Sequence, residues 1–87
     1  MKTLFSTRFK KQYKKLRLAE QKKFDAVLDL FEIDATNPVL NNHWLQGKYR
    51  GCRSINVTGD IRAIYQPIAE DMAYFIAIGT HSKLYSE

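Results

Sequence analysis

The chain has 87 residues, of which 45% are hydrophobic and 13% aromatic, and 14 Lys and Arg against nine Asp and Glu give a formal net charge of +5. This length fits one small domain over residues 1–87, and the apolar content excludes a disordered polar chain. A single cysteine, Cys52, excludes an internal disulfide, and no apolar run resembles a signal peptide or approaches the roughly 18 residues of a membrane span. We therefore expect a cytoplasmic protein without a membrane partner, whose charge favours nucleic acid or an acidic protein.

The first 37 residues predict an edge strand followed by two helices. Residues 2–5 have the composition of a short edge strand, and Ser6 or Thr7 offers an N-cap for the helix that follows. Apolar residues then recur at steps of four and three, first at Phe5, Phe9, Tyr13 and Leu16, and again at Phe24, Val27, Leu28 and Phe31. The second stripe predicts a helix over residues 19–35, which Asn37-Pro38 stops.

Charge is segregated between the two predicted helices. Residues 1–23 contain nine basic residues and one acid, Glu20, whereas residues 24–37 contain four acids and no Lys or Arg. The basic face of the first helix is either a solvated surface or a face that attracts an RNA backbone or an acidic partner. The acidic face of the second helix is expected to face solvent or to pair loosely with the first helix.

Residues 39–48 read as a loop, because Asn41-Asn42 and Gly47 break any period. The loop carries His43 and Trp44. From residue types alone, His43 is interpreted as a surface residue and Trp44 as a packing anchor for the loop.

A β-hairpin is predicted next, with strands at residues 55–57 and 61–65 joined by a turn at residues 58–60. If Ile55 and Ile61 point toward the helices, the alternation of side chains along a strand puts a polar set on the opposite face: Asn56, Asp60 and Arg62. Cys52, at the start of the hairpin, is interpreted as a small half-buried residue rather than a nucleophile.

Residues 72–78 are the most hydrophobic run and predict a central strand, since aromatic and β-branched residues dominate it. Gln66-Pro67 is expected to end the preceding strand, and Gly79-Thr80-His81 this one, which leaves Lys83 and Tyr85 in a tail near His81. The expected order is β-α-α-β-β-β. This is an α+β domain with a helical hairpin on one face of a small, largely antiparallel sheet, and the other face open.

The open face has the groups needed to cleave RNA by attack of a ribose 2′-hydroxyl on the adjacent phosphorus. This reaction needs a base, an acid and cations, but no metal. Three side chains can exchange protons: His43, His81 and Asp60. Five can hold or neutralise phosphate, and two can stack on a base: Lys48, Arg50, Arg53, Arg62 and Lys83, then Trp44 and Tyr85. We expect His81 to be the acid and favour His43 as the base, with Asp60 orienting His43 or acting in its place.

No metal or cofactor site is expected. The histidines, Cys52 and Asp60 lack the close spacing of zinc ligands, and residues 47–51 lack the ending of a nucleotide-binding P-loop.

Short motifs also follow one another in a fixed order: Leu45-Gln46-Gly47, Tyr49-Arg50-Gly51-Cys52-Arg53, Val57, Asp60-Ile61-Arg62-Ala63-Ile64-Tyr65, Gly79-Thr80-His81 and Leu84-Tyr85. Together they resemble the RelE/ParE superfamily of bacterial type II toxins, and most closely its YafQ-like branch. The resemblance implies the RelE-like fold, cleavage of mRNA in the ribosomal A site, and neutralisation by an antitoxin that wraps the toxin.

The resemblance also implies residue roles. It places catalytic groups at His43, Asp60 and His81 and an active-site aromatic at Tyr85. Arg62 matches the strand arginine that RelE-like members use on the scissile phosphate, although the YafQ-like branch does not generally rely on it. Asn56, also expected to contact RNA, stands where the YafQ-like pattern has another histidine.

Two alternatives remain open at this point. ParE-like relatives share the fold but bind DNA gyrase without cutting RNA, and they would not need His43 and His81 at these positions. A degenerate toxin would keep only the antitoxin interface, and Asn56, which cannot transfer a proton, is the residue that favours this alternative.

Overall fold

A computed structural model of the chain describes residues 1–86, and residue 87 lies outside the described part. The elements follow in the order β1 (Lys2–Phe5), α1 (Thr7–Lys15), α2 (Leu18–Ile33), η1 (Pro38–Leu40), β2 (His43–Trp44), η2 (Gly47–Tyr49), β3 (Arg53–Asn56), β4 (Ile61–Ala69), β5 (Met72–Thr80) and α3 (His81–Ser86). Within residues 1–86, no helix is both long and apolar enough to span a membrane.

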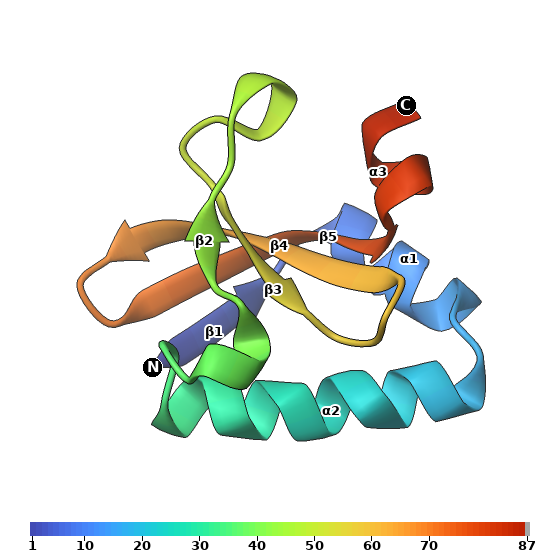
Figure 1. The fold of residues 1–87 in the computed structure, drawn as a ribbon, viewed down its shortest axis with the longest axis horizontal. Helices are drawn as coiled ribbons and strands as arrows, with labels where there is room; N and C mark the ends of the chain where they lie inside the picture. Colours follow the sequence, from blue (N-terminus) through green and yellow to red (C-terminus); the bar gives the residue numbers. More distant parts are fainter. Residues whose placement is uncertain (87) are drawn as a thin grey trace.

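Five strands form one sheet in the order β1-β5-β4-β3-β2. β1 pairs with β5 in parallel, and the other neighbours are antiparallel. Figure 1 shows α2 running beneath this sheet, while α3 and the loop that carries η2 rise from the opposite side. The predicted α+β class, with helices packed on one face of a largely antiparallel sheet, is confirmed.

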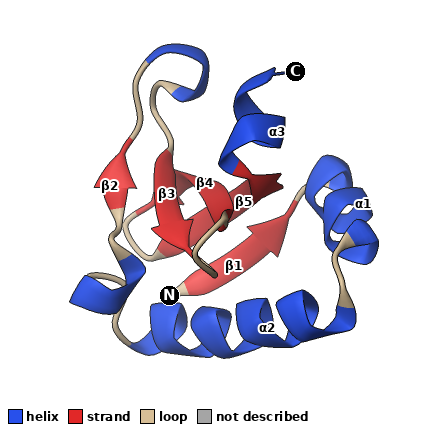
Figure 2. Ribbon diagram, turned by 45° about the vertical axis from the view of Figure 1, so that its right-hand side comes forward, coloured by secondary structure: helices blue, strands red, loops and turns tan. Residues whose placement is uncertain are grey.

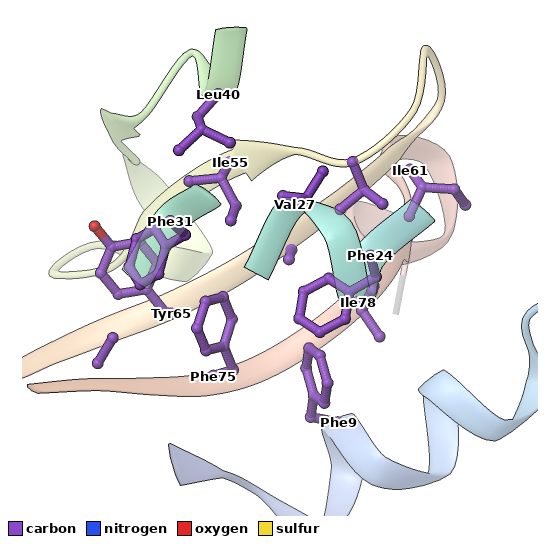
Figure 3. Packing of buried hydrophobic residues seen from close by; sticks show 13 residues of the cluster. Phe9, Phe24, Val27, Phe31, Leu40, Ile55, Ile61, Tyr65, Phe75 and Ile78 are labelled. Atoms are coloured by element: carbon purple, nitrogen blue, oxygen red, sulfur yellow. The ribbon is translucent and has the colours of Figure 1, made fainter. Parts of the chain in front are cut away.

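The predicted stripes build the core between the helices and the sheet. Ser6 caps α1 as expected, because its Oγ accepts a hydrogen bond of 3.0 Å from the Phe9 amide. Rings from α2 and β5 meet edge to face in this layer (Figure 3): the Phe24 and Phe75 centroids are 5.9 Å apart and those of Phe31 and Phe75 are 5.4 Å apart. Ile55 and Ile61 point into the same core, so the predicted alternation of the hairpin is confirmed.

The sequence interpretation was wrong at two places in the sheet. Residues 39–48 are not simply a loop, because His43 and Trp44 form an edge strand that pairs with Ser54 and Arg53. β4 also continues past Gln66-Pro67 to Ala69. The pairing with β3 ends at Tyr65, so Pro67 lies where β4 has a neighbour on one side only and need not remove a ladder hydrogen bond.

A third correction concerns the face that was expected to be open. Residues 81–86 form a helix, α3, rather than a tail, and Figure 2 shows it beside the η2 loop on the side of the sheet away from α2. A second apolar cluster lies beneath them and consists of Tyr49, Cys52, Ile64, Ala77 and Leu84. Part of this sheet face is therefore covered rather than open.

The core predicts a large effect at Phe24. Phe24→Ala should lower the free energy of unfolding by about 3–5 kcal/mol, because it removes a ring that is 2% exposed and leaves a cavity. Urea denaturation measures the change. Ile33→Ala is the control on the same helix, since Ile33 is 84% exposed and its loss should change stability by less than about 0.5 kcal/mol. Equal effects of the two substitutions would contradict this packing.

Candidate active site

Two structural elements that are distant in sequence meet at one end of the sheet. Ile61, the first residue of β4, pairs with Thr80, the last residue of β5. This register brings the turn before β4 next to the start of α3. A hollow of about 360 Å³ lies there, lined by Gly59, Asp60, Arg62, Thr80, His81 and Ser82.

Asp60 and His81 provide the proton-exchanging groups of this hollow. Asp60 is exposed in the turn, where its amide donates to the Thr58 hydroxyl at 3.2 Å. His81 opens α3 and is also exposed. Its ring lies 4.6 Å from that of Tyr85, at 32°, one turn further along the helix. The structure therefore brings together the predicted Asp60, Arg62 and His81, with Tyr85 against His81.

Arg62 performs a structural task in this turn. Its Nη1 donates to the Thr58 and Ile61 carbonyls at 2.8 and 3.0 Å, and its Nη2 donates to the Gly59 carbonyl at 3.1 Å. These bonds use three of the five N–H groups of a guanidinium, so two take no part in holding the turn. Arg62 can thus fix Asp60 in place and still present N–H donors to an anion.

Asn56 lies next to Arg62, because the two residues are directly paired across β3 and β4. Its Oδ1 is buried and has no hydrogen-bond partner among the described residues. A buried acceptor without a donor lowers stability by roughly 1–3 kcal/mol. Asn56 is thus held beside Arg62 at a cost in stability, but it does not line the hollow.

His43 is not part of the hollow. Across the sheet, His43 pairs with Ser54, Ser54 with Ile64, and Ile64 with Ala77. The backbone of His43 is therefore three strand spacings away from Ala77, and His81 lies a further four residues along the chain. With strands about 4.8 Å apart and a rise of about 3.3 Å per residue, this separation is on the order of 20 Å. The His43 Nδ1 lies 2.7 Å from the Asn41 carbonyl, an acceptor that keeps the proton on Nδ1.

Arg53 and Trp44 also lie elsewhere. They are cross-strand partners, with the Arg53 guanidinium carbon 4.6 Å from the centre of the Trp44 ring, and Arg53 Nε donates to Asn42 Oδ1 at 2.6 Å. Arg53 pairs with Tyr65, whose ring belongs to the helix side of the sheet. The pair of Arg53 and Trp44 thus faces away from the hollow.

The remaining predicted cations flank α3. Lys48 and Arg50 are exposed in the η2 loop, and Lys48 Nζ donates to the Leu84 carbonyl at 3.2 Å. Lys83 is exposed on α3 and lines a second, neighbouring groove. Within residues 1–86, no three His, Cys, Asp or Glu side chains gather in a way that would hold a metal ion.

Tyr49 is a supporting residue to which the sequence interpretation gave no role. Its hydroxyl donates to the Leu84 carbonyl at 3.0 Å and accepts from Arg8 Nη2 at 3.2 Å. Its ring meets Tyr85 edge to face at 5.3 Å. Burial, followed by the proximity of Tyr49 and Cys52, raises the pKa of Tyr85, so the ring against His81 stays a neutral phenol. The motif around Tyr49 was noticed, but a contact with α3 has no signal in sequence.

Cys52 lies inside the same layer. It is 7% exposed, and desolvation by burial raises the pKa of its thiol. Both observations fit a small packing residue, which is more deeply buried than the half-buried residue that the sequence predicted, because a reactive cysteine needs an exposed thiolate.

Comparison with known proteins adds to this geometry. The family model described as "Bacterial toxin of type II toxin-antitoxin system, YafQ" matches residues 1–86. No curated protein sequence matches. Among solved structures, the chain is similar to YafQ from E. coli strain BL21(DE3), with 24% identity, 95% of this chain and 96% of that chain covered, and a TM-score of 0.76.

Two further structures extend the comparison. One is the E. coli DinJ-YafQ toxin-antitoxin complex, with 26% identity over 95% of this chain and 94% of that chain and a TM-score of 0.73. The other is a YoeB/ParE toxin from Agrobacterium tumefaciens, with 15% identity over 93% of this chain and 99% of that chain and a TM-score of 0.75. At these identities, the first and the last of the three structures show a shared fold and no more.

The hydrogen bonds of Arg62 predict a loss of stability that is separable from any loss of activity. Arg62→Ala should lower the free energy of unfolding by about 1 kcal/mol, since three turn carbonyls lose a charged donor at a partly exposed site. Arg50→Ala removes the same charge from an exposed position and should leave stability within about 0.5 kcal/mol. Thermal and urea unfolding of both variants would test this, and identical stabilities would show that Arg62 does not hold the turn.

Proposed function

The chain belongs to the YafQ family of bacterial type II toxins, within the RelE superfamily, and we propose that it is an endoribonuclease that cleaves mRNA and thereby inhibits translation. The observation that supports an enzyme most directly is the hollow in which Asp60, Arg62 and His81 meet. A base, a cation and an acid within one site are what cleavage through the ribose 2′-hydroxyl requires.

The proposed reaction proceeds in one displacement. Asp60 accepts the proton of the 2′-hydroxyl as its oxygen attacks the adjacent phosphorus. The bond from phosphorus to the 5′-oxygen breaks, and His81 gives its proton to that oxygen, so that a 2′,3′-cyclic phosphate and a 5′-hydroxyl result. Histidine suits the acid step because it gains and loses a proton near neutrality. No electron transfer and no metal are involved.

Arg62 is proposed to stabilise the charge that develops on the phosphoryl oxygens. It is placed next to Asp60 by the same hydrogen bonds that shape the turn, so little reorganisation accompanies the reaction. Preorganised donors of this kind contribute several kcal/mol in other enzymes.

His43 is assigned a lesser role than residue chemistry alone gave it. It lies on the edge strand, on the order of 20 Å from His81 by strand geometry. Asp60 already lines the hollow with His81. We therefore assign the base to Asp60 and place His43 along the path of the RNA, beyond the scissile bond.

The partner is proposed to be an antitoxin protein. A structure similar to this chain is a toxin-antitoxin complex, and the net charge of +5 favours an acidic segment in the partner. The mRNA is proposed to be presented by the ribosome, as the family resemblance implies.

Expression of the chain alone should stop growth and translation. Cellular mRNAs should acquire new ends with a 5′-hydroxyl, and co-expression of the antitoxin should restore growth. Ribosome profiling measures translation, and sequencing of 5′-hydroxyl ends measures cleavage. Proteins with Arg50→Ala or His81→Gln, expressed at equal levels, serve for comparison. Growth arrest with intact mRNA would exclude the nuclease and favour a binding toxin, and normal growth would exclude a toxin altogether.

Single-turnover cleavage on ribosomes, with the protein in excess and RNA binding matched, should separate the roles. His81→Gln and Asp60→Asn should each slow cleavage by about a hundredfold or more, the scale of a lost acid or base. His43→Gln should slow cleavage by less than about tenfold, because the imidazole of His43 does not line the hollow. A variant with His81→Gln that cuts at the wild-type rate would remove the acid assignment, and a hundredfold loss in His43→Gln would return the base to His43.

A metal chelator that leaves the ribosomes intact should leave the rate of the same reaction unchanged. Cleavage that stops when protein-bound divalent metal is removed and returns with added metal would contradict the mechanism.

A further inference from the structure

A groove lies beside the proposed active site and has no role in the mechanism above. Its volume is about 470 Å³, and it runs between the end of α1, the start of α2 and α3. Thr80 lines both the groove and the hollow. The first turn of α3 separates the two, because His81 and Ser82 face the hollow while Lys83 and Leu84 face the groove.

The accessible part of the groove is cationic. Three exposed basic side chains line it, Lys15, Arg17 and Lys83, against one carboxylate, Glu20. Glu20 accepts a hydrogen bond of 3.0 Å from the Arg17 amide, so it is already used at the start of α2. The local excess of positive charge favours an anionic occupant.

The apolar lining distinguishes a nucleic acid from an amphipathic peptide. Ile61, Ile78 and Leu84 line the groove but are only 1–3% exposed. A docked helix would need apolar surface still accessible to water, and among the apolar side chains of the lining only Leu16 is partly exposed. Phosphates need only accessible cations, which the groove has.

We propose that this groove binds the RNA strand on the 3′ side of the scissile phosphate. The inference rests on the proposed function and follows from the placement of its acid. His81 gives its proton to the 5′-oxygen of the downstream nucleotide, so that nucleotide lies on the His81 side of the hollow. Beyond His81 the next depression is the groove, where Lys15, Arg17 and Lys83 meet the phosphates that follow.

The consequence is that catalytic efficiency depends on how far the RNA extends on the 3′ side of the scissile phosphate. RNA that continues several nucleotides past the scissile phosphate gains contacts in the groove, and RNA that ends directly after the downstream nucleotide does not. An extension on the 5′ side gains none of these contacts. Because the contacts are made to phosphates, the gain should shrink at high salt.

The test compares two mRNAs bound to ribosomes. One continues several nucleotides past the scissile phosphate, and the other ends directly after the downstream nucleotide. Wild-type protein should cleave the longer RNA with a kcat/KM about tenfold higher than that for the shorter RNA, as expected for one to two phosphate contacts. The difference should lie in KM and not in kcat. The double variant Lys15→Gln with Arg17→Gln should lose this preference and keep kcat. The control is Lys22→Gln with Lys23→Gln, which removes the same two charges from exposed positions of α2 outside the groove.

Each outcome has a separate meaning. If RNA is cleaved at equal efficiency at both lengths, or if both double variants lose the preference alike, the groove does not bind the 3′ strand and the nuclease assignment stands. If no RNA of either length is cleaved, the proposed function fails and the groove assignment fails with it. If the groove variant binds and cuts RNA like wild type but loses affinity for the antitoxin, the groove belongs to the protein partner and the RNA assignment is overturned.

Discussion

The position of α3 is the constraint on which the accessible half of the molecule depends. Leu84 holds the helix on the sheet, and its Cδ2 lies 3.6 Å from the place that a Cβ on Gly79 would occupy. Lys48 and Tyr49 of the η2 loop both donate to the Leu84 carbonyl, so the loop and the helix hold each other. A six-residue helix has little stability alone, and this packing is what keeps it in place. This packing therefore also fixes the start of the helix, which is His81, the proposed acid.

The same placement separates two depressions at one end of the sheet. α3 lies across the end of β5, and the polar turn of β3 and β4 lies on one side of it while α1 lies on the other. Arg62 holds the turn by donating hydrogen bonds to the carbonyls of the turn, and Leu84 holds the helix through apolar contact. The hollow is thus made by two supports, one electrostatic and one apolar, which the pairing of Ile61 with Thr80 and of Arg62 with Gly79 joins. A site built on sheet ends needs such supports to hold its groups in fixed geometry.

The sequence predicted those features that depend on short-range patterns. The four- and three-residue steps placed Phe24 and Phe31 in the core, and two-residue alternation placed Ile55 toward the helices and Arg62 away from them. β2 was missed because two residues show no period, and only their pairing with β3 makes them a strand. α3 was missed for a similar reason, since six residues are too few for an amphipathic pattern to be distinct.

The candidate site shows the same limit. The adjacency of Asp60 and Arg62 follows from a turn and one strand, so the sequence predicted it. The distance between His43 and His81 depends on the order and register of four strands, which residue chemistry does not contain. Two histidines in one small chain were therefore grouped as an acid and a base, although strand geometry separates them.

Asn56 sharpens what this separation means for the chemistry. Of the described residues that line the hollow, Asp60 and His81 are the ones that exchange protons, and the neighbouring Asn56 has an amide that cannot. The amide still offers a buried acceptor, Oδ1, and the N–H donors of its Nδ2, so it can orient a hydroxyl or a base without taking part in proton transfer. In the proposed mechanism a carboxylate and a histidine are therefore the groups that transfer protons, and Asn56 has no part in that transfer.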